Sequence, residues 1–456
     1  MTHTRTVAII GAGPAGVYAA DILLSRDEEV RIDLFEKLPA PYGLVRYGVS
    51  PDHPRIKKIQ DALHVVLENP RIRLVCNVEI GVDVTIDELR EAYDGVVIAT
   101  GADRDVDLRV PGAELPGSFG GADFVAWYDG HPDAPTEWPL DAEAVAVIGA
   151  GNVALDVARM IITHPEQLTQ TDIPDHVEAA FTQNPVRDLH LLIRRGPADV
   201  RFSPMELREL GARDDVDVIV DPADMVLDDH AKRMIAQFNQ RKIIMRTLEE
   251  WASIDPATRT ASRRVHLHFY QQPARILGED RVTAIEMERT QPDELGRITA
   301  TGETVLHNVG AVYRTIGYRS TPVPGVPFDE ASGTIPDSAG RVLDDAGEPI
   351  PGLYATGWIR RGPVGLIGST KSDASEAIAS MLVDLAEREE RGEGSATSSA
   401  AADALCERLS HSVGWDGWLR IDEAERTLGA ERGRERTKIV DRTQLLEHAR
   451  EMERTR

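Results

Sequence analysis

The feature that most constrains this chain is a glycine-rich turn near its first residues. Residues 7–10 are an apolar run typical of a buried parallel strand, and GAGPAG at 11–16 then leads into a predicted helix. Gly11 allows a tight turn, Gly13 lets a pyrophosphate approach the backbone, and Gly16 lets the helix pack closely on the strand. The free N–H groups at the helix start favour a phosphate. This pattern predicts a dinucleotide-binding unit rather than an ordinary turn.

An acidic residue follows the second predicted strand. Residues 32–35 are strand-like and end at Glu36, about twenty residues after the glycines, where a carboxylate is expected to meet a ribose hydroxyl. A further buried strand ends in Ala-Thr-Gly at 99–101, and residues this small allow a nucleotide to lie close. Residues 1–105 are therefore expected to form a doubly wound α/β unit.

A long segment rich in proline and glycine, residues 37–54, follows Glu36. This composition rules out a regular helix, and long ordered loops in α/β proteins tend to carry function. Its aromatic and aliphatic content favours packing on something flat and large. Helical spacing predicts one helix at about 55–68, and a capping-box pattern predicts another helix start at 85.

The opening pattern recurs at residues 145–154, where an apolar strand leads to Gly149-Ala150-Gly151 and a helix. Ala154 replaces the third glycine, a variant that the fingerprint allows. A strand at 188–193 ends in Arg194 and Arg195, where a site for NAD would have an acid. Two guanidiniums suit a 2′-phosphate, so the second unit is expected to bind NADP. The alternative is a pair of solvated arginines.

The two units are expected to be nested. Residues 352–358 repeat the Ala-Thr-Gly turn of 99–101, which predicts that the chain returns to the first unit to complete it. A helix at about 371–388 then closes the fold. The composition of 392–402 indicates a flexible linker, and the tail beyond it is expected to be a docking appendage or mostly solvated. The predicted units are 1–105 and 326–390 for the first dinucleotide, 106–325 for the second, and 391–456 for the linker and extension.

Composition excludes several classes of protein. The net charge of −25 disfavours nucleic-acid binding, and an apolar run of about eighteen residues, as a membrane span needs, is absent. The short polar start before the first strand leaves no room for a secretion signal, so we expect a cytoplasmic protein. Cys76 and Cys406 are far apart, so the sequence contains no C-x-x-C dithiol and no cysteine-ligated cluster or zinc site.

In these motifs, the chain resembles the adrenodoxin reductase family, whose members are NADPH-ferredoxin reductases with a glutathione-reductase-like fold. The resemblance covers about residues 5–390 and rests on the segments 11–16, 36–37, 41–54, 151–159, 194–197, 206–209 and 357–363. It implies an α/β fold of two Rossmann-like domains, with the NADP domain inserted in the FAD domain. The tail resembles the extension of some actinobacterial members.

The resemblance also implies cofactor-binding residues. It assigns FAD to Ala15, Glu36, Leu44, Ile80, Trp358, Gly365, Leu366 and Ile367. It assigns NADP to Ala150, Gly151, Asn152, Val153, Arg194, Arg195, Glu206 and Gly365. Trp358 is expected to be a lid over FAD rather than an electron relay. His53, with Glu209 and Asp156, is expected near the flavin as a proton-handling or electrostatic group; the alternative is that His53 merely packs there.

The implied reaction needs a flavin between two partners. NADPH delivers a hydride and a ferredoxin accepts single electrons, and a flavin takes two electrons and releases one at a time. Because such ferredoxins are acidic iron–sulfur proteins, a local basic patch is expected. The candidates are Lys57, Lys58, Arg201, Arg208, Arg360 and Arg361. Two alternatives remain open: another FAD/NADPH enzyme, such as a flavin monooxygenase or the electron-input subunit of a larger complex, and a nucleotide-sensing protein without turnover.

Overall fold

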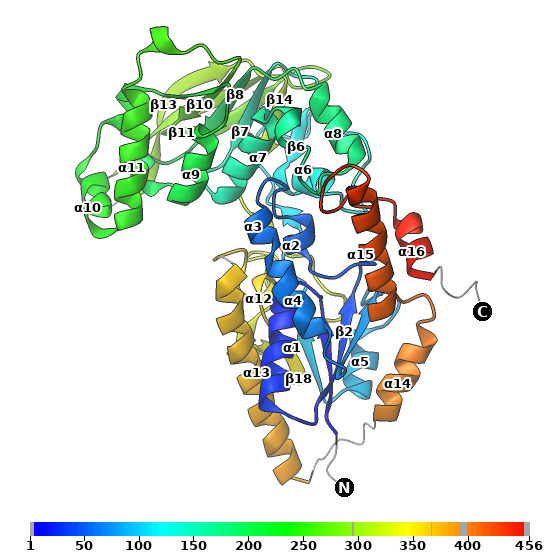
Figure 1. Ribbon diagram of the computed structural model, residues 1–456. Helices are drawn as coiled ribbons and strands as arrows, with labels where there is room; N and C mark the ends of the chain where they lie inside the picture. Colours follow the sequence, from blue (N-terminus) through cyan, green and yellow to red (C-terminus); the bar gives the residue numbers. More distant parts are fainter. Residues whose placement is uncertain (1–3, 294–295, 366, 393–398, 451–456) are drawn as a thin grey trace.

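A computed structural model describes residues 4–293, 296–365, 367–392 and 399–450, and Figure 1 shows its two lobes. Each lobe is built around a mostly parallel sheet with helices packed on it. The lower lobe contains both early and late segments of the chain, whereas the upper lobe contains only the middle. The second dinucleotide-binding unit is therefore inserted in the first, which confirms the predicted fold class. The finer boundaries of the units stay predictions.

The first unit is a seven-stranded sheet in the order β16-β17-β18-β4-β1-β2-β3. Its strands are β1 Thr6–Ile10, β2 Arg31–Glu36, β3 Ile72–Cys76, β4 Gly95–Ile98, β16 Asp337–Ser338, β17 Arg341–Leu343 and β18 Pro349–Ala355. β18 pairs in parallel with β4, with Leu353 opposite Val96, so the late strand extends the early sheet. This pairing confirms the nested topology that the repeated Ala-Thr-Gly turn predicts.

Helices cover both faces of this sheet. Helices α1 and α13 pack together on one face, and α5 and α14 lie on the other (Figure 1). Their bounds are α1 Pro14–Arg26, α5 Ile86–Ala92, α13 Ile367–Glu390 and α14 Ser399–Arg408. Thr85 caps α5 as predicted, because its hydroxyl accepts from Glu88 N and the Glu88 carboxylate accepts from Thr85 N. The single helix expected at 55–68 is instead α3 Pro54–Lys57 and α4 Ile59–Leu67, separated at Lys58.

The second unit has two sheets packed face to face. A six-stranded parallel sheet in the order β6-β14-β7-β8-β10-β9 lies against an antiparallel sheet in the order β11-β12-β13. The strands are β6 Ser118–Gly120, β7 Ala144–Ile148, β8 Asp188–Leu192, β9 Val216–Val220, β10 Arg263–His268, β11 Gln271–Leu277, β12 Ala284–Pro292, β13 Ile298–His307 and β14 Ala311–Arg314. Alternate residues of β8 face opposite ways: Leu189 and Leu191 pack in the helix-covered core, and Leu192 packs toward the antiparallel sheet.

Most of the remaining helices lie on the other face of the six-stranded sheet, whereas the two short helices at 44–47 and 358–361 pack in the first unit. The remaining helices are α2 Leu44–Tyr47, α6 Gly121–Tyr128, α7 Asn152–Ile162, α8 Asp175–Thr182, α9 Pro204–Gly211, α10 Asp229–Gln237, α11 Asn239–Ala252 and α12 Trp358–Arg361. A two-stranded sheet, β5 Arg104–Asp105 with β15 Tyr318–Arg319, joins the two chain crossings between the units. Within the described ranges, no helix has the length and apolar character needed to cross a membrane.

The C-terminal extension is an integral part of the fold. The prediction of a mostly solvated tail is wrong, because α15 Trp415–Ala430 buries Trp418 against Tyr42, with ring centroids 5.6 Å apart; a docking role stays a prediction. Cys76 and Val413 exchange two backbone hydrogen bonds of 2.9 Å. Residues 393–398 of the predicted linker lie outside the described part of the chain, and 399–402 belong to α14 rather than to a linker.

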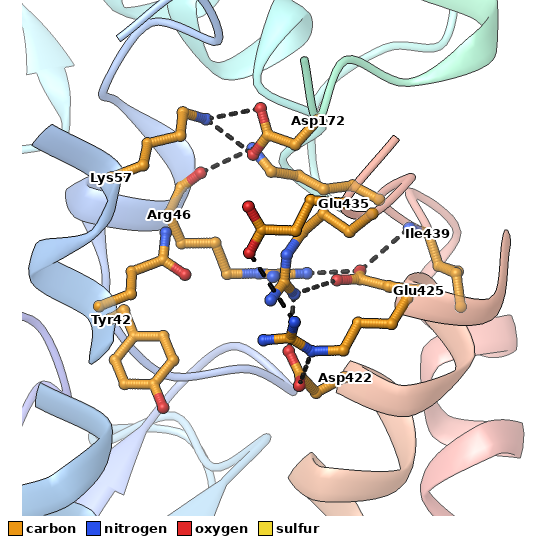
Figure 2. Close-up of polar contacts among 12 residues, drawn as sticks. Tyr42, Arg46, Lys57, Asp172, Asp422, Glu425, Glu435 and Ile439 are labelled. Atoms are coloured by element: carbon orange, nitrogen blue, oxygen red, sulfur yellow. Dashed lines mark hydrogen bonds and ion pairs between the residues drawn. The ribbon is translucent and has the colours of Figure 1, made fainter. Parts of the chain in front are cut away.

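The extension also ties the two units together (Figures 1 and 2). Before α16 Arg442–Arg450, Lys438 Nζ donates to Arg46 O and to Asp129 O, both at 2.8 Å. It forms a further ion pair with Asp172, 3.2 Å away. Because Arg46 belongs to the first unit and Asp129 and Asp172 to the second, one buried lysine contacts both. Contacts of this kind restrain the relative position of the two lobes.

Candidate functional site

The first glycine turn leaves no room for larger residues. Gly11 has φ +103°, and a Cβ there would lie 2.5 Å from Ala99 O. A Cβ at Gly16 would lie 1.9 Å from Gly11 O, so the close approach of α1 to the turn requires glycine. By contrast, Gly101 at the end of the neighbouring strand faces open space. The edge of the sheet between these two turns therefore has room for a ligand.

Glu36 lies behind the glycine turn and orders it. Its Oε2 accepts from Ala12 N at 2.9 Å, and its Oε1 accepts from Leu38 N at 3.1 Å. Burial raises the pKa of this carboxyl group, against the lowering effect of these backbone hydrogen bonds. The carboxylate thus holds the turn in its observed shape. The contact with a ribose hydroxyl stays a prediction.

Three other segments border the same turn. Tyr42 N donates to Ala12 O at 2.8 Å, which places the loop carrying Leu44 against the turn. A Cβ at Gly357 would lie 2.6 Å from Ala15 Cβ, so the return turn before Trp358 also touches the start of α1. The remaining assigned residues differ in their setting: Ile80 is buried in the core, Gly365 is exposed, and Leu366 and the side chain of Ile367 lie outside the described residues.

Apolar side chains are exposed on the loops around this edge. Leu44, an assigned flavin-binding residue, is 36% exposed, and Val364, which precedes the assigned Gly365, is 73% exposed. Trp358 is half-buried, with its ring 6.3 Å from that of Tyr318. Exposed apolar groups on loops beside a glycine turn are typical of a surface that a ligand covers.

The second glycine turn is held from outside by a neighbouring segment. Ala150 O accepts from Arg201 N at 2.7 Å and from Phe202 N at 3.1 Å, and Asn152 Oδ1 accepts from Ser203 N at 2.8 Å. Gly151 faces open space at the start of α7, and Val153 is half-buried in its first turn. The helix N-terminus is thus free to receive a phosphate.

A cavity of about 550 Å³ lies beside this turn, at the carboxyl end of β8. Its lining residues are Arg194, Arg195, Asp199, Arg201, His230, Met234, Arg241, Gln272, Gly296, Arg297 and Ile298. The guanidiniums of Arg194, Arg195 and Arg201 have no hydrogen-bonding partner within the described part of the chain. Arg241 and Arg297 are paired with Asp199 and Asp293. The excess of cationic groups makes this cavity a site for an anion.

His53 lies where the loop of the first unit meets helices α7 and α9 of the second. Its Nε2 is 3.3 Å from Asp156 Oδ1 and 3.2 Å from Glu206 Oε2, and its Nδ1 is 3.5 Å from Glu209 Oε2. The structure thus brings together His53, Asp156 and Glu209, which the resemblance groups, and adds Glu206, which it assigns to NADP. We call these four residues the His53 cluster.

Three further charged residues surround the His53 cluster, and sequence reasoning did not assign them. Arg159, with no exposed side-chain area, pairs with Asp52 at 2.7 Å, and also with Asp156 and Glu206. Arg213 contacts Asp52 as well. From the sequence, only the spacing of Asp156 and Arg159, three residues apart on α7, could have indicated part of this ion-pair network.

The electrostatics of the cluster favour a charged imidazole. Burial by itself lowers the pKa of His53, but hydrogen bonds to Asp156 and Glu206 outweigh it and raise the pKa to about 10. Burial likewise opposes ionisation of Asp52, but Arg159 and Arg213 hold the pKa of this carboxyl well below its usual range. The carboxylates around His53 thus favour its protonated form, whereas the guanidinium of Arg159, which contacts His53 Nε2, opposes it.

The structure corrects the candidate docking surface. The side chain of Lys57 is only 10% exposed and pairs with Asp129 and Asp172 at 2.7 and 2.9 Å. Arg360 is 8% exposed and pairs with Asp337, Asp373 and Glu376. Arg361 is half-exposed but is also paired with Asp373, so these three residues do not form a free basic patch.

The other three candidates, Lys58, Arg201 and Arg208, are exposed.

Cys76 is buried and Cys406 half-buried, and both thiols are free. Burial raises the pKa of Cys406 to about 11 and that of Cys76 well above its usual value, so neither is a reactive thiolate.

Known proteins similar to this chain are nucleotide-dependent oxidoreductases. The family model of pyridine nucleotide-disulphide oxidoreductases matches residues 5–188. NADPH-ferredoxin reductase FprA of Mycobacterium tuberculosis is 38% identical, over 96% of this chain and 98% of that protein. The mitochondrial NADPH:adrenodoxin oxidoreductase of Bos taurus is 36% identical, over 97% of this chain and 92% of that protein.

A solved structure of Mycobacterium tuberculosis FprA in complex with NADPH superposes with a TM-score of 0.91 at 37% identity. The superposition covers 98% of this chain and all of that one. Relatives thus match in sequence and in fold along nearly the whole chain, the C-terminal extension included. The protein belongs to the adrenodoxin reductase family, the NADPH-ferredoxin reductases, among the pyridine nucleotide-disulphide oxidoreductases.

Proposed function

We propose that this protein is an FAD-containing NADPH-ferredoxin reductase, which passes electrons from NADPH to a ferredoxin one at a time. The observation that carries the proposal is the arginine-lined cavity beside the second glycine turn. Unpaired guanidiniums at this position suit the 2′-phosphate that distinguishes NADPH from NADH. We therefore assign the flavin nucleotide to the first glycine turn, which has Glu36 and exposed apolar loops around it.

The residues present fit both nucleotides. Gly101 and Gly151 border open space at the two sheet edges. Gly151 belongs to the second glycine turn, the part of such a fold that a pyrophosphate approaches closely. Leu44 and Val364 offer apolar area to a flat ring system. FAD, when bound, supplies the chemistry of taking two electrons and releasing them singly. The chain itself has to hold the two nucleotides in place and exclude water between them.

Each group of residues has a role in this proposal. Arg194 and Arg195 bind the 2′-phosphate, and residues 150–153 bind the pyrophosphate of NADPH. Leu44 and Trp358 cover the flavin, and Trp358 acts as a lid. The His53 cluster lies at the junction of the two units, where a protonated imidazole provides positive charge and a proton at Nε2 or Nδ1.

The partner is proposed to be an acidic iron–sulfur ferredoxin of the [2Fe–2S] or a similar type, which serves acceptors such as P450 enzymes. Lys58, Arg201 and Arg208 are the exposed cations that remain for a docking patch. Arg201 also lines the nucleotide cavity, so Lys58 and Arg208 are the residues whose change tests docking alone. The cytoplasmic location expected from the sequence stays a prediction, which fractionation of cells tests.

An anaerobic assay with NADPH, the FAD-loaded protein, a [2Fe–2S] ferredoxin and cytochrome c tests this function. Cytochrome c reduction that depends on ferredoxin supports it. In a parallel aerobic assay, a flavin monooxygenase would instead consume oxygen and hydroxylate a substrate in step with NADPH oxidation. A subunit of a larger complex would reduce ferricyanide but not ferredoxin, and a nucleotide sensor would oxidise no NADPH; either result would overturn the proposal.

A further inference from the structure

Four histidines lie between the two sheets of the second unit, away from both glycine turns. His190 is on β8, His266 and His268 are on β10, and His307 ends β13. Strands alternate their side chains, so His190 shares a face with Leu192, the face that meets the antiparallel sheet. β8 and β10 are paired with His190 opposite His266, which places the rings of neighbouring strands side by side.

The ring nitrogens of three of these histidines converge. His190, His268 and His307 each present one nitrogen, and the three atoms lie within 4.8 Å of one another. The distance from His190 Nδ1 to His268 Nε2 is 3.0 Å. Two nitrogens bound to one tetrahedral zinc ion at about 2.0–2.1 Å lie about 3.3 Å apart, so this pair already has nearly the spacing of two ligands.

Neighbouring side chains orient the rings, as is usual around metal ligands. Gln271 Oε1 lies 2.7 Å from His307 Nε2, and Asp188 Oδ1 lies 2.8 Å from His266 Nε2. The ring of His266 stacks on that of His190, with centroids 4.8 Å apart and planes inclined by 15°. These contacts hold the imidazoles in a fixed group rather than as separate surface residues.

The chemistry of the group selects one class of ligand. Neutral imidazole is the form that binds metals. Three nitrogen ligands without carboxylates suit Zn²⁺, Cu²⁺, Ni²⁺ or Co²⁺ and disfavour Mg²⁺ and Ca²⁺, which prefer oxygen.

We propose that His190, His268 and His307 form a binding site for a divalent transition-metal cation, with Zn²⁺ as the expected ion and water in a fourth position. Because His307 comes from β13 and the other two from the parallel sheet, the ion links the two sheets of the second unit. The site is separate from the nucleotide-binding residues. Its expected effect is on the stability of this unit rather than on the reaction.

Titration of chelator-treated, FAD-loaded protein with Zn²⁺ tests the site, with calorimetry as the readout. Saturating NADP⁺ is included so that the His53 cluster, which also has three possible ligands, does not compete for the ion. We expect one tight site and a rise in melting temperature. His190→Gln and His268→Gln each weaken Zn²⁺ binding by at least about tenfold, and Gln271→Ala weakens it by about tenfold without removing a ligand.

His411→Gln, which changes an exposed histidine elsewhere, is the matched control and leaves Zn²⁺ binding unchanged. Binding that is absent in the original protein, or undiminished in both ligand variants, would overturn the proposal. If the variants do not fold, the visible absorption spectrum of the original protein with added Co²⁺ tests the site instead. Intense bands of nitrogen-ligated Co²⁺ support the site, and the weak spectrum of hydrated Co²⁺ contradicts it.

Discussion

Arg46 and Glu425 form an ion pair in which neither side chain has any exposed area, with Nη2 and Oε1 2.5 Å apart (Figure 2). Glu425 also accepts from Ile439 N at 3.0 Å, and the Arg46 guanidinium lies 5.1 Å from the ring centroid of Trp418. The pair joins helix α15 of the extension to helix α2, which carries Leu44. The extension therefore supports the loop that borders the proposed flavin site.

Breaking this pair is expected to destabilise the protein strongly. Glu425→Gln leaves the Arg46 cation buried without its counter-charge, which lowers the free energy of unfolding by about 3–5 kcal/mol. Urea denaturation of the FAD-loaded protein measures the change. Glu423→Gln, an exposed position on the same helix, is the control and changes it by less than about 0.5 kcal/mol. Equal effects of the two variants would show that the pair contributes no specific stability.

Gly151→Ala is expected to separate folding from nucleotide binding. A Cβ at Gly151 meets no atom within 4 Å, so the melting temperature should stay within about 2 °C of the original value. The added methyl group occupies the path of the pyrophosphate, so the Kd for NADP⁺ should rise about tenfold or more. Gly347→Ala, at another open but distant position, leaves the Kd unchanged. Unaltered NADP⁺ binding in Gly151→Ala would place the pyrophosphate elsewhere.

The raised pKa of His53 has a consequence for stability. A histidine with a pKa of about 10 in the folded state stabilises the fold fully below its unfolded pKa of about 6.5, and this contribution is lost as pH rises through about 10. The unfolding free energy of the original protein should therefore fall relative to His53→Gln by about 2–5 kcal/mol between pH 6.5 and 10. Parallel pH profiles of the two proteins would mean that His53 is neutral in the fold.

Charge reversal at the exposed docking residues should affect ferredoxin alone. In Lys58→Glu with Arg208→Glu, the KM for ferredoxin should rise about tenfold, because complementary charge steers association of the acidic partner. NADPH-dependent ferricyanide reduction should not change, since neither residue lines the nucleotide cavity. Lys242→Glu makes a similar change on an exposed part of α11 and serves as control. A similar loss with both acceptors would remove these residues from the docking surface.

Local patterns predicted both glycine turns and the strands around them. The turns at 11–16 and 149–154, and the strands that precede them, depend on short apolar runs and on glycines such as Gly11, Gly16 and Gly149, whose space is taken by neighbouring atoms. Arg194 and Arg195 follow β8 directly, so their position at the sheet edge also came from local order. Arg241 and Arg297 also line the arginine-rich cavity beside the second glycine turn. They lie within residues 221–300, where no sequence motif predicted a binding site.

Contacts between residues far apart in the sequence could not be predicted from local patterns, for a physical reason. Lysine is rarely buried, so Lys57 was interpreted as a surface charge, but Asp129 and Asp172 from the other unit neutralise it in the interior. The charged composition of α15 suggested solvation, whereas Trp418 anchors that helix against Tyr42. The grouping of His53 with Asp156 and Glu209 came from the family resemblance, because no local spacing relates residues this far apart.

The reduction of bound flavin, followed anaerobically by stopped flow, tests the central claim most directly. The FAD-loaded protein is mixed with NADPH or NADH, and a [2Fe–2S] ferredoxin is added afterwards. We predict half-saturation at a concentration of NADPH at least about tenfold below that of NADH, reversal of the bleaching by ferredoxin, and loss of the NADPH preference in Arg194→Gln with Arg195→Gln. A preference for NADH, or a reduced flavin that ferredoxin does not reoxidise, would contradict the account.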